Sequence, residues 1–292
     1  MIFIFRTKRS TNKFVEAFAQ NSGHQTKMFD NAETTGEQFY NYTWPNFHGR
    51  MAEGVEFCFQ GLIRGTDKLK PYFKTNKWYY FDQPYFFYTA YQQHKDFNDQ
   101  WYRINVNNVQ TNKIDNNPKH LDRYKRLLDI SREEIELKNW RTTGEHILVI
   151  PPSYHTAKWY GFSEDRWLQN TVKEIKKHTD RPIRVRYKYN GGAKFGERVD
   201  INNPLHIDLQ SCWAIVSFHS MCASHAVRRG IPSFCSEHSP AAPVSLSLKD
   251  LDKLENPIIT EREQWMATLL GSQFTLKEMK SGYAYRYLNE ND

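Results

Sequence analysis

Short apolar runs alternate with amphipathic segments along the chain, and this alternation is the feature that most restricts its fold. Residues 146–150 and 213–218 are almost entirely apolar, as strands buried on both faces of a parallel sheet are. Helical patterns follow them at 164–178 and 221–229, and Gly230 ends the second helix before another strand begins. Strands alternating with helices predict α/β units with parallel sheets.

The first half of the chain begins with a similar strand and helix, at residues 2–5 and 14–19. Strands are predicted at 25–29 and 77–81, and a helical or mixed segment at 51–63. With 292 residues and 39% hydrophobic content, the chain is long enough for two domains of ordinary size.

The domain linker is predicted after the charged helical pattern at 118–135, which follows a stretch rich in Asn, Gln and Tyr. The prediction is therefore two Rossmann-like domains facing a cleft, at 1–140 and 141–274. The terminal segment 275–292 is expected to form a helix that crosses back to the first domain.

Bulk properties favour a cytoplasmic protein with reduced thiols. The four cysteines lack metal-ligand spacing, the histidines lack HxxH or HExxH spacing with a third ligand, and no metal is predicted. The opening apolar run is too short for a signal peptide or a membrane span. The formal charge of +7 suits an anionic partner but does not select one.

The strongest local signal is a buried strand that runs into a helix through Phe218-His219-Ser220. Backbone N–H groups and the Ser220 hydroxyl then lie at the carboxyl edge of the sheet, where anions bind. The predicted anion site comprises Ser217, His219, Ser220 and Met221. An ordinary strand–helix turn without a ligand, with His219 packed or capping the helix, is the alternative.

Two further segments are expected at the same edge. In the pattern Ile-Arg-Val-Arg-Tyr-Lys, Arg186 and Lys188 alternate with apolar residues and share one side of a strand, which suits a diphosphate clamp without a metal. A solvated edge strand is the alternative. Glu237 and His238 open a proline-broken loop that can hydrogen-bond a sugar or nucleobase, or serve only as a connector.

Three segments carry a resemblance to a known family. They are residues 146–187, the block from Ser217-Phe-His-Ser to Gly-Ile-Pro, and the tail 265–284 with Gln-Phe-Thr-Leu-Lys-Glu-Met-Lys-Ser-Gly. Together they resemble bacteriophage-encoded glycosyltransferases of the GT-B type. The resemblance implies a nucleotide-diphosphate sugar donor in the carboxyl domain, an acceptor in the amino domain, and the host-cell cytoplasm as location.

The expected acceptor site lies in the first domain. Asp82 follows the strand at 77–81 and is the candidate general base, although an Asp that caps a turn before proline is the alternative. Tyr85, Tyr102 and Arg103 belong to a region in which basic and aromatic residues alternate, as in nucleic-acid-binding surfaces, although many of these aromatic residues suit a core equally well.

The sequence thus predicts a hexosyl- or pentosyltransferase with a UDP-sugar donor. The favoured acceptor is 5-hydroxymethylcytosine in double-stranded phage DNA, as the resemblance implies. Transfer to a surface polysaccharide or other glycan is one alternative. A non-catalytic DNA-binding protein on the same scaffold is another.

Overall fold

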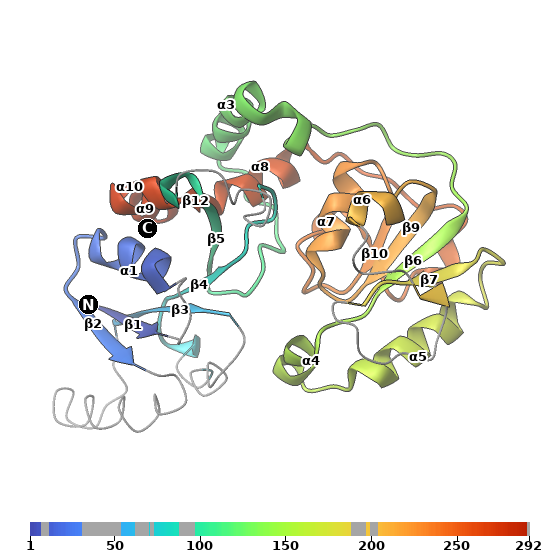
Figure 1. The fold of residues 1–292 in the computed structure, drawn as a ribbon, viewed down its shortest axis with the longest axis horizontal. Coiled ribbons are helices and arrows are strands. Elements are labelled where there is room, and N and C mark those ends of the chain that lie inside the picture. Colours follow the sequence, from blue (N-terminus) through green and yellow to red (C-terminus); the bar gives the residue numbers. More distant parts are fainter. Residues whose placement is uncertain are drawn as a thin grey trace. The chain divides into compact units, whose positions relative to one another are not determined.

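The chain folds into two compact units in a computed structural model that describes residues 1–6, 12–30, 54–61, 70, 73–87, 97–187, 197–198 and 204–290 (Figure 1). Unit 1 consists of Met1–Val109 and Ser272–Asp292, and unit 2 of Gln110–Gly271. Each unit contains a six-stranded sheet. The predicted α/β class with two sheets is confirmed.

The sheet of unit 1 has the order β12-β5-β4-β3-β1-β2. Its strands are β1 (Ile2–Arg6), β2 (Thr26–Asp30), β3 (Glu56–Gln60), β4 (Trp78–Asp82), β5 (Trp101–Val106) and β12 (Gln273–Thr275). The first four are parallel, whereas β5 is antiparallel to both of its neighbours. The helical or mixed prediction for 51–63 is wrong where the structure describes that segment, because β3 lies at the centre of this sheet.

The carboxyl-terminal segment belongs to unit 1, and it is not a single helix. It forms β12, α9 (Leu276–Lys280) and α10 (Tyr283–Asn289). Thr275 and Glu278 make a reciprocal capping box that starts α9 immediately after the strand. Side chains of α9, α10 and α1 (Asn12–Gln20) share one hydrophobic core with β1, β4 and β5.

The sheet of unit 2 has the order β11-β10-β9-β6-β7-β8 and is entirely parallel. Its strands are β6 (His146–Ile150), β7 (Ile183–Val185), β8 (Glu197–Arg198), β9 (Cys212–Ser217), β10 (Ser233–Cys235) and β11 (Leu246–Ser247). The two central strands, β6 and β9, are buried along their whole length. Their carboxyl ends therefore meet at one edge, where ligands bind in open α/β sheets.

Six α-helices are described in unit 2: α3 (Pro118–Ile135), α4 (Tyr154–Tyr160), α5 (Glu164–Ile175), α6 (Leu205–Asp208), α7 (Met221–Arg228) and α8 (Glu263–Gly271). Apolar residues of α5 pack on one face of the sheet with β6, β7 and β9. The short helix α7 connects β9 to β10 and contacts both strands.

The division between the units differs from the predicted boundary near residue 140. The segment 110–140 belongs to unit 2 because α3 packs against α8. The loop that precedes α3 is bound to α8 as well, since the Asp115 N–H donates to the Thr268 hydroxyl at 3.1 Å. The charged residues of α3 indicate that one face of this helix is solvated. They do not indicate which unit its buried face packs against.

Candidate functional site

The carboxyl end of β9 leads directly into α7, as the sequence predicts. Ser220 is the N-cap residue, and its hydroxyl accepts a hydrogen bond from the Cys222 N–H at 3.2 Å. Ser217 is fully buried, and its hydroxyl has no hydrogen-bond partner among the described residues. Leaving a buried hydroxyl unpaired costs about 1–3 kcal/mol. An anion at this helix start would accept hydrogen bonds from the backbone N–H groups of its first turn.

Four rings gather beside this turn. Tyr160 from α4 stacks on His238 with ring centroids 4.4 Å apart, and its edge contacts Phe218 at 5.2 Å and His219 at 5.8 Å. Burial raises the pKa of Tyr160, so its hydroxyl stays protonated. Such rings can contact a nucleobase or sugar beside an anion site. The sequence prediction omitted Tyr160, because an aromatic residue in a helical pattern usually belongs to the core.

Hydrogen bonds hold the two loops that carry these rings. The Ser236 hydroxyl donates to the Phe218 carbonyl at 2.6 Å, and the Asn112 amide donates to the Glu237 carbonyl at 2.7 Å. The Glu237 carboxylate itself is 88% exposed and lies 3.8 Å from His238 Nε2. The loop at Glu237 and His238 is therefore attached to the β9–α7 turn, and among these two residues only His238 takes part in the ring cluster.

Arg186, one of the two cations predicted to form a diphosphate clamp, is paired with a carboxylate that the sequence prediction did not include. Burial raises the pKa of the Cys222 thiol in the first turn of α7, and the Ser220 hydroxyl and then the Arg186 charge oppose this shift. Arg186 also forms an ion pair with Asp208, whose side chain is only 3% exposed. The positive charge expected for a diphosphate is therefore offset by a buried carboxylate. Lys188, the second predicted cation, lies outside the described residues.

In unit 1, Asp82 is the last residue of β4 and its carboxylate accepts three hydrogen bonds. Oδ2 accepts from the Tyr80 hydroxyl at 2.7 Å and from Arg103 Nη2 at 3.0 Å. Oδ1 accepts from the Gln83 N–H at 2.8 Å. The Asp82 side chain remains 35% exposed, so the carboxylate is oriented and accessible at the same time.

The three residues predicted to contact the acceptor are buried instead, which corrects that expectation. Tyr85 is fully buried, and its hydroxyl is 3.3 Å from Asn105 Oδ1. The ring of Tyr102 packs on Phe14 in the core. Arg103 is 2% exposed and forms the ion pair with Asp82. Successive side chains of β5 point to opposite faces of the sheet, and both faces are covered there. The central side chains of this strand are therefore buried whichever face they are on.

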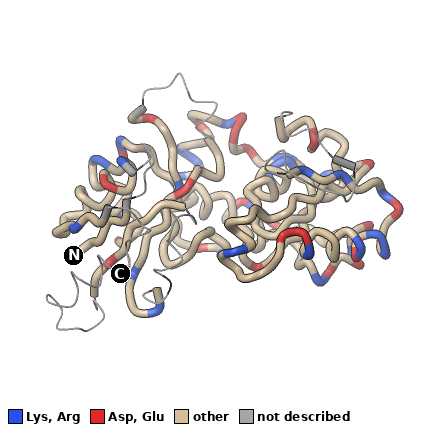
Figure 2. Tube along the Cα trace, turned by 60° about the horizontal axis from the view of Figure 1, so that its bottom comes forward, with Lys and Arg blue, Asp and Glu red and all other residues tan. Residues whose placement is uncertain are grey.

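Charge alone does not mark a nucleic-acid-binding face in the part of the chain that the structure describes. In Figure 2, acidic segments are interspersed with basic ones along both units. Among the described residues, no group of three or more His, Cys, Asp or Glu side chains is arranged to hold a metal ion. No described helix combines the length and apolar character needed to cross a bilayer.

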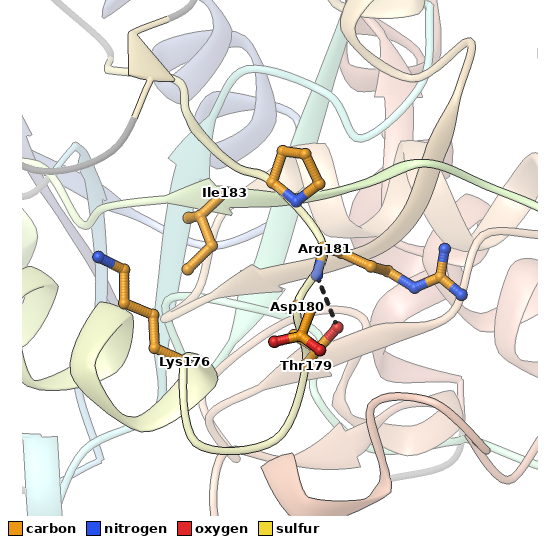
Figure 3. Close-up of a pocket in the computed structure, with 6 residues that line it drawn as sticks. Lys176, Thr179, Asp180, Arg181 and Ile183 are labelled. Carbon is orange, nitrogen blue, oxygen red and sulfur yellow. Dashed lines mark hydrogen bonds between the residues drawn. The ribbon is translucent and has the colours of Figure 1, made fainter.

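A hollow of about 420 Å³ opens beside the turn between α5 and β7, lined by Lys176, Thr179, Asp180, Arg181, Pro182 and Ile183 (Figure 3). It lies at the amino end of β7, away from the strand ends that carry the predicted donor residues. The Arg181 side chain donates to both Glu255 carboxylate oxygens, at 3.0 and 3.1 Å from Nε, and its guanidinium lies over the Trp213 ring. These contacts give Arg181 a structural role, and we do not assign the reaction to this hollow.

The fold is similar to that of solved glycosyltransferases. KpsC from Thermosulfurimonas dismutans, described as a beta Kdo 2,7 transferase, aligns with a TM-score of 0.53 and 10% identity, covering 100% of this chain and 99% of that chain. KpsC described as a beta Kdo 2,4 transferase aligns with a TM-score of 0.51 and 9% identity, covering 92% of this chain and 89% of that chain. No family model matches the sequence, and no curated protein matches it. The chain therefore has a GT-B-type fold, with two α/β units that each contain a largely parallel sheet.

Proposed function

We propose that the protein is a glycosyltransferase that binds the phosphates of a nucleotide sugar at the β9–α7 turn. The observation that carries this proposal is the unsatisfied buried hydroxyl of Ser217 beside the Ser220-capped helix start, next to the ring cluster of Tyr160, Phe218, His219 and His238. The GT-B-type fold supports it, because carboxyl ends of parallel strands are where such folds bind ligands. A UDP-sugar is the proposed donor, as the sequence resemblance implies.

Asp82 is the proposed general base. Its carboxylate accepts the proton of an acceptor hydroxyl while that oxygen bonds to the anomeric carbon of the donor. The bond from the anomeric carbon to the phosphate oxygen breaks, and its electron pair leaves with the nucleotide phosphate. Backbone N–H groups of α7 stabilise the charge that develops on this leaving group, and Arg186, whose charge Asp208 partly offsets, contributes to this.

Two acceptor classes follow from different observations. A glycan hydroxyl is favoured by the likeness to proteins described as Kdo transferases. A hydroxymethylated base in DNA rests on the phage resemblance and on the formal charge of +7. Burial of Tyr85, Tyr102 and Arg103 removes the described side chains that supported the DNA acceptor, so both acceptor classes are carried into the transfer assays.

A thermal-shift screen with UDP, GDP, CMP and their sugar derivatives tests the donor proposal, since a ligand that binds only the folded chain raises Tm. We expect a shift with a uridine nucleotide that Ser220→Ala loses. Ser163→Ala is the matched control, because Ser163 caps α5 in the same way and lies outside the proposed site. No shift with any nucleotide, or equal losses in both variants, contradicts the assignment.

Transfer assays with the donor found in that screen test the base and the acceptor. Asp82→Asn should lower turnover by about 100-fold or more, because the amide cannot accept the acceptor proton. Parallel reactions with extracted polysaccharide and with hydroxymethylated DNA separate the two acceptor classes. Unchanged turnover in Asp82→Asn excludes Asp82 as the base.

A further inference from the structure

The hydrogen bonds of Asp82 are distributed unequally between its two carboxylate oxygens. Oδ2 accepts from two side chains, Tyr80 at 2.7 Å and Arg103 at 3.0 Å, whereas Oδ1 accepts, among the described residues, from the Gln83 backbone alone. A carboxylate oxygen with two strong donors has little capacity left for a proton, and an oxygen with a single backbone donor keeps a lone pair available. The oxygens are therefore chemically distinct.

The strand register explains how the two side chains reach the same oxygen. Tyr80 precedes Asp82 by two residues on β4, so both side chains lie on one face of the sheet. Arg103 pairs directly with Asp82 across the β4–β5 ladder. The side chain of Arg103 also donates to the Gln83 carbonyl at 2.9 Å, and its guanidinium lies 4.9 Å from the centre of the Tyr85 ring.

Both donors are fixed in protonation and in position. Tyr80 is 2% exposed, and burial together with the Asp82 charge raises its pKa well above the usual range, so the hydroxyl remains a donor. Arg103 is also 2% exposed, and arginine stays charged in proteins. A buried ion pair contributes little net stability because desolvation offsets the attraction. Its presence at an accessible carboxylate is better explained by orientation of that carboxylate.

We propose that Tyr80 and Arg103 are positioning residues that hold Asp82 through Oδ2 and leave Oδ1 as the atom that accepts the acceptor proton. This inference rests on the proposed role of Asp82 as the base. Among the described residues, Tyr80 and Arg103 contact the carboxylate, and the Tyr85 ring lies beside the Arg103 guanidinium. Arg103 thus acts on the reaction through Asp82, and not through contact with the acceptor.

The test compares Tyr80→Phe with Tyr79→Phe in the full-length chain. Tyr79 lies on the same strand and is also buried, but its hydroxyl donates to Asn289 instead of Asp82. Each variant therefore loses one buried hydroxyl from β4, and only Tyr80→Phe removes a donor from the carboxylate. Thermal melts confirm that both variants fold.

The first readout is the carboxyl carbon signal of Asp82, measured by NMR on protein labelled with ¹³C-aspartate and assigned by its loss in Asp82→Asn. Removing a hydrogen bond changes the electronic surroundings of the carboxylate, so this signal, compared at one neutral pH, should move in Tyr80→Phe. Tyr79→Phe should leave it unchanged. Equal signals in both variants overturn the inference, and this readout needs no substrate.

The second readout is the pH dependence of kcat/KM for sugar transfer. The acid limb of the profile should differ from that of the natural chain in Tyr80→Phe, and it should coincide with it in Tyr79→Phe. A moved carbon signal with an unmoved acid limb overturns the positioning role. Full activity in Asp82→Asn instead overturns the proposed base, which distinguishes the two failures.

Discussion

At the scale of single residues, His146 connects the stability of unit 2 to pH. Its ring is 2% exposed at the start of β6, and Nε2 lies 3.1 Å from the Asp208 carbonyl. Burial, together with the Arg184 charge, lowers the pKa of His146 from its ordinary value of 6.5. The folded chain binds a proton at His146 less tightly than the unfolded chain does. The stability that the neutral ring provides is therefore fully present at pH values above 6.5. That stability is lost as the pH falls through the lower folded pKa.

The unfolding free energy of the natural chain should fall between pH 7 and pH 5. We expect this fall to be about 1 kcal/mol smaller in His146→Gln. Urea denaturation at several pH values measures this difference. His155→Gln, which changes an exposed histidine of the same unit, is the control and should keep the full pH dependence. Part of the dependence should persist in His146→Gln, because burial also lowers the pKa of His120.

The ion pair between Arg186 and Asp208 makes a second residue-scale prediction. Asp208→Asn removes the carboxylate that pairs with the guanidinium, whose side chain is 16% exposed. The expected loss is about 3 kcal/mol of unfolding free energy, measured by urea denaturation. Replacing both partners with apolar residues, Arg186→Met with Asp208→Leu, should recover most of it. Equal losses in the single and double variants would contradict this interpretation.

At the scale of elements, Gly230 shows why α7 can return so tightly into β10. Its φ is +76°, and a Cβ there would lie 1.9 Å from the Asn139 carbonyl oxygen. Gly161 has a similar φ of +79° but no atom near the position of an added Cβ. Gly161→Ala should therefore cost about 1 kcal/mol for the left-handed backbone alone. Gly230→Ala should cost at least twice as much, and similar Tm losses for the two variants would contradict the steric explanation.

Elements of unit 2 were more predictable from sequence than those of unit 1, for a physical reason. Strands β6 and β9 are buried on both faces, so each appears as a continuous apolar run. Strand β5 instead includes Arg103 and Asn105, which are buried through ion pairing and hydrogen bonds that no local pattern reveals. The start of α9 was marked by the Thr275 and Glu278 spacing, which the prediction of one long helix overlooked.

The candidate site was predictable where it depended on local geometry. Ser217, His219 and Ser220 lie at one strand–helix turn, and that turn follows from the hydrophobic pattern. The partners of charged residues were not predictable, since Arg186 meets Asp208 and Arg103 meets Asp82 across separate elements. Only the tertiary fold shows that each of these two cations is paired with a carboxylate.

At the scale of the whole molecule, the two units differ in how the chain builds them. Unit 2 is the single stretch Gln110–Gly271, whereas unit 1 needs Ser272–Asp292 in addition to Met1–Val109. The terminal segment supplies an edge strand, β12, and core residues that include Phe274 and Met279. Without it, the core around α1 and β5 would be exposed.

Residues 110–271 expressed alone should therefore unfold cooperatively, with a calorimetric transition of their own, because one continuous stretch contains the whole core of unit 2. Residues 1–109 alone should lack such a transition. Joining 1–109 to 272–292 through a Gly/Ser linker should restore it, since the linker replaces only the covalent connection that unit 2 provides. A cooperative transition in 1–109 alone would show that β12, α9 and α10 are dispensable for unit 1. Failure of the linked chain to fold would show that unit 1 depends on unit 2 for more than its connection.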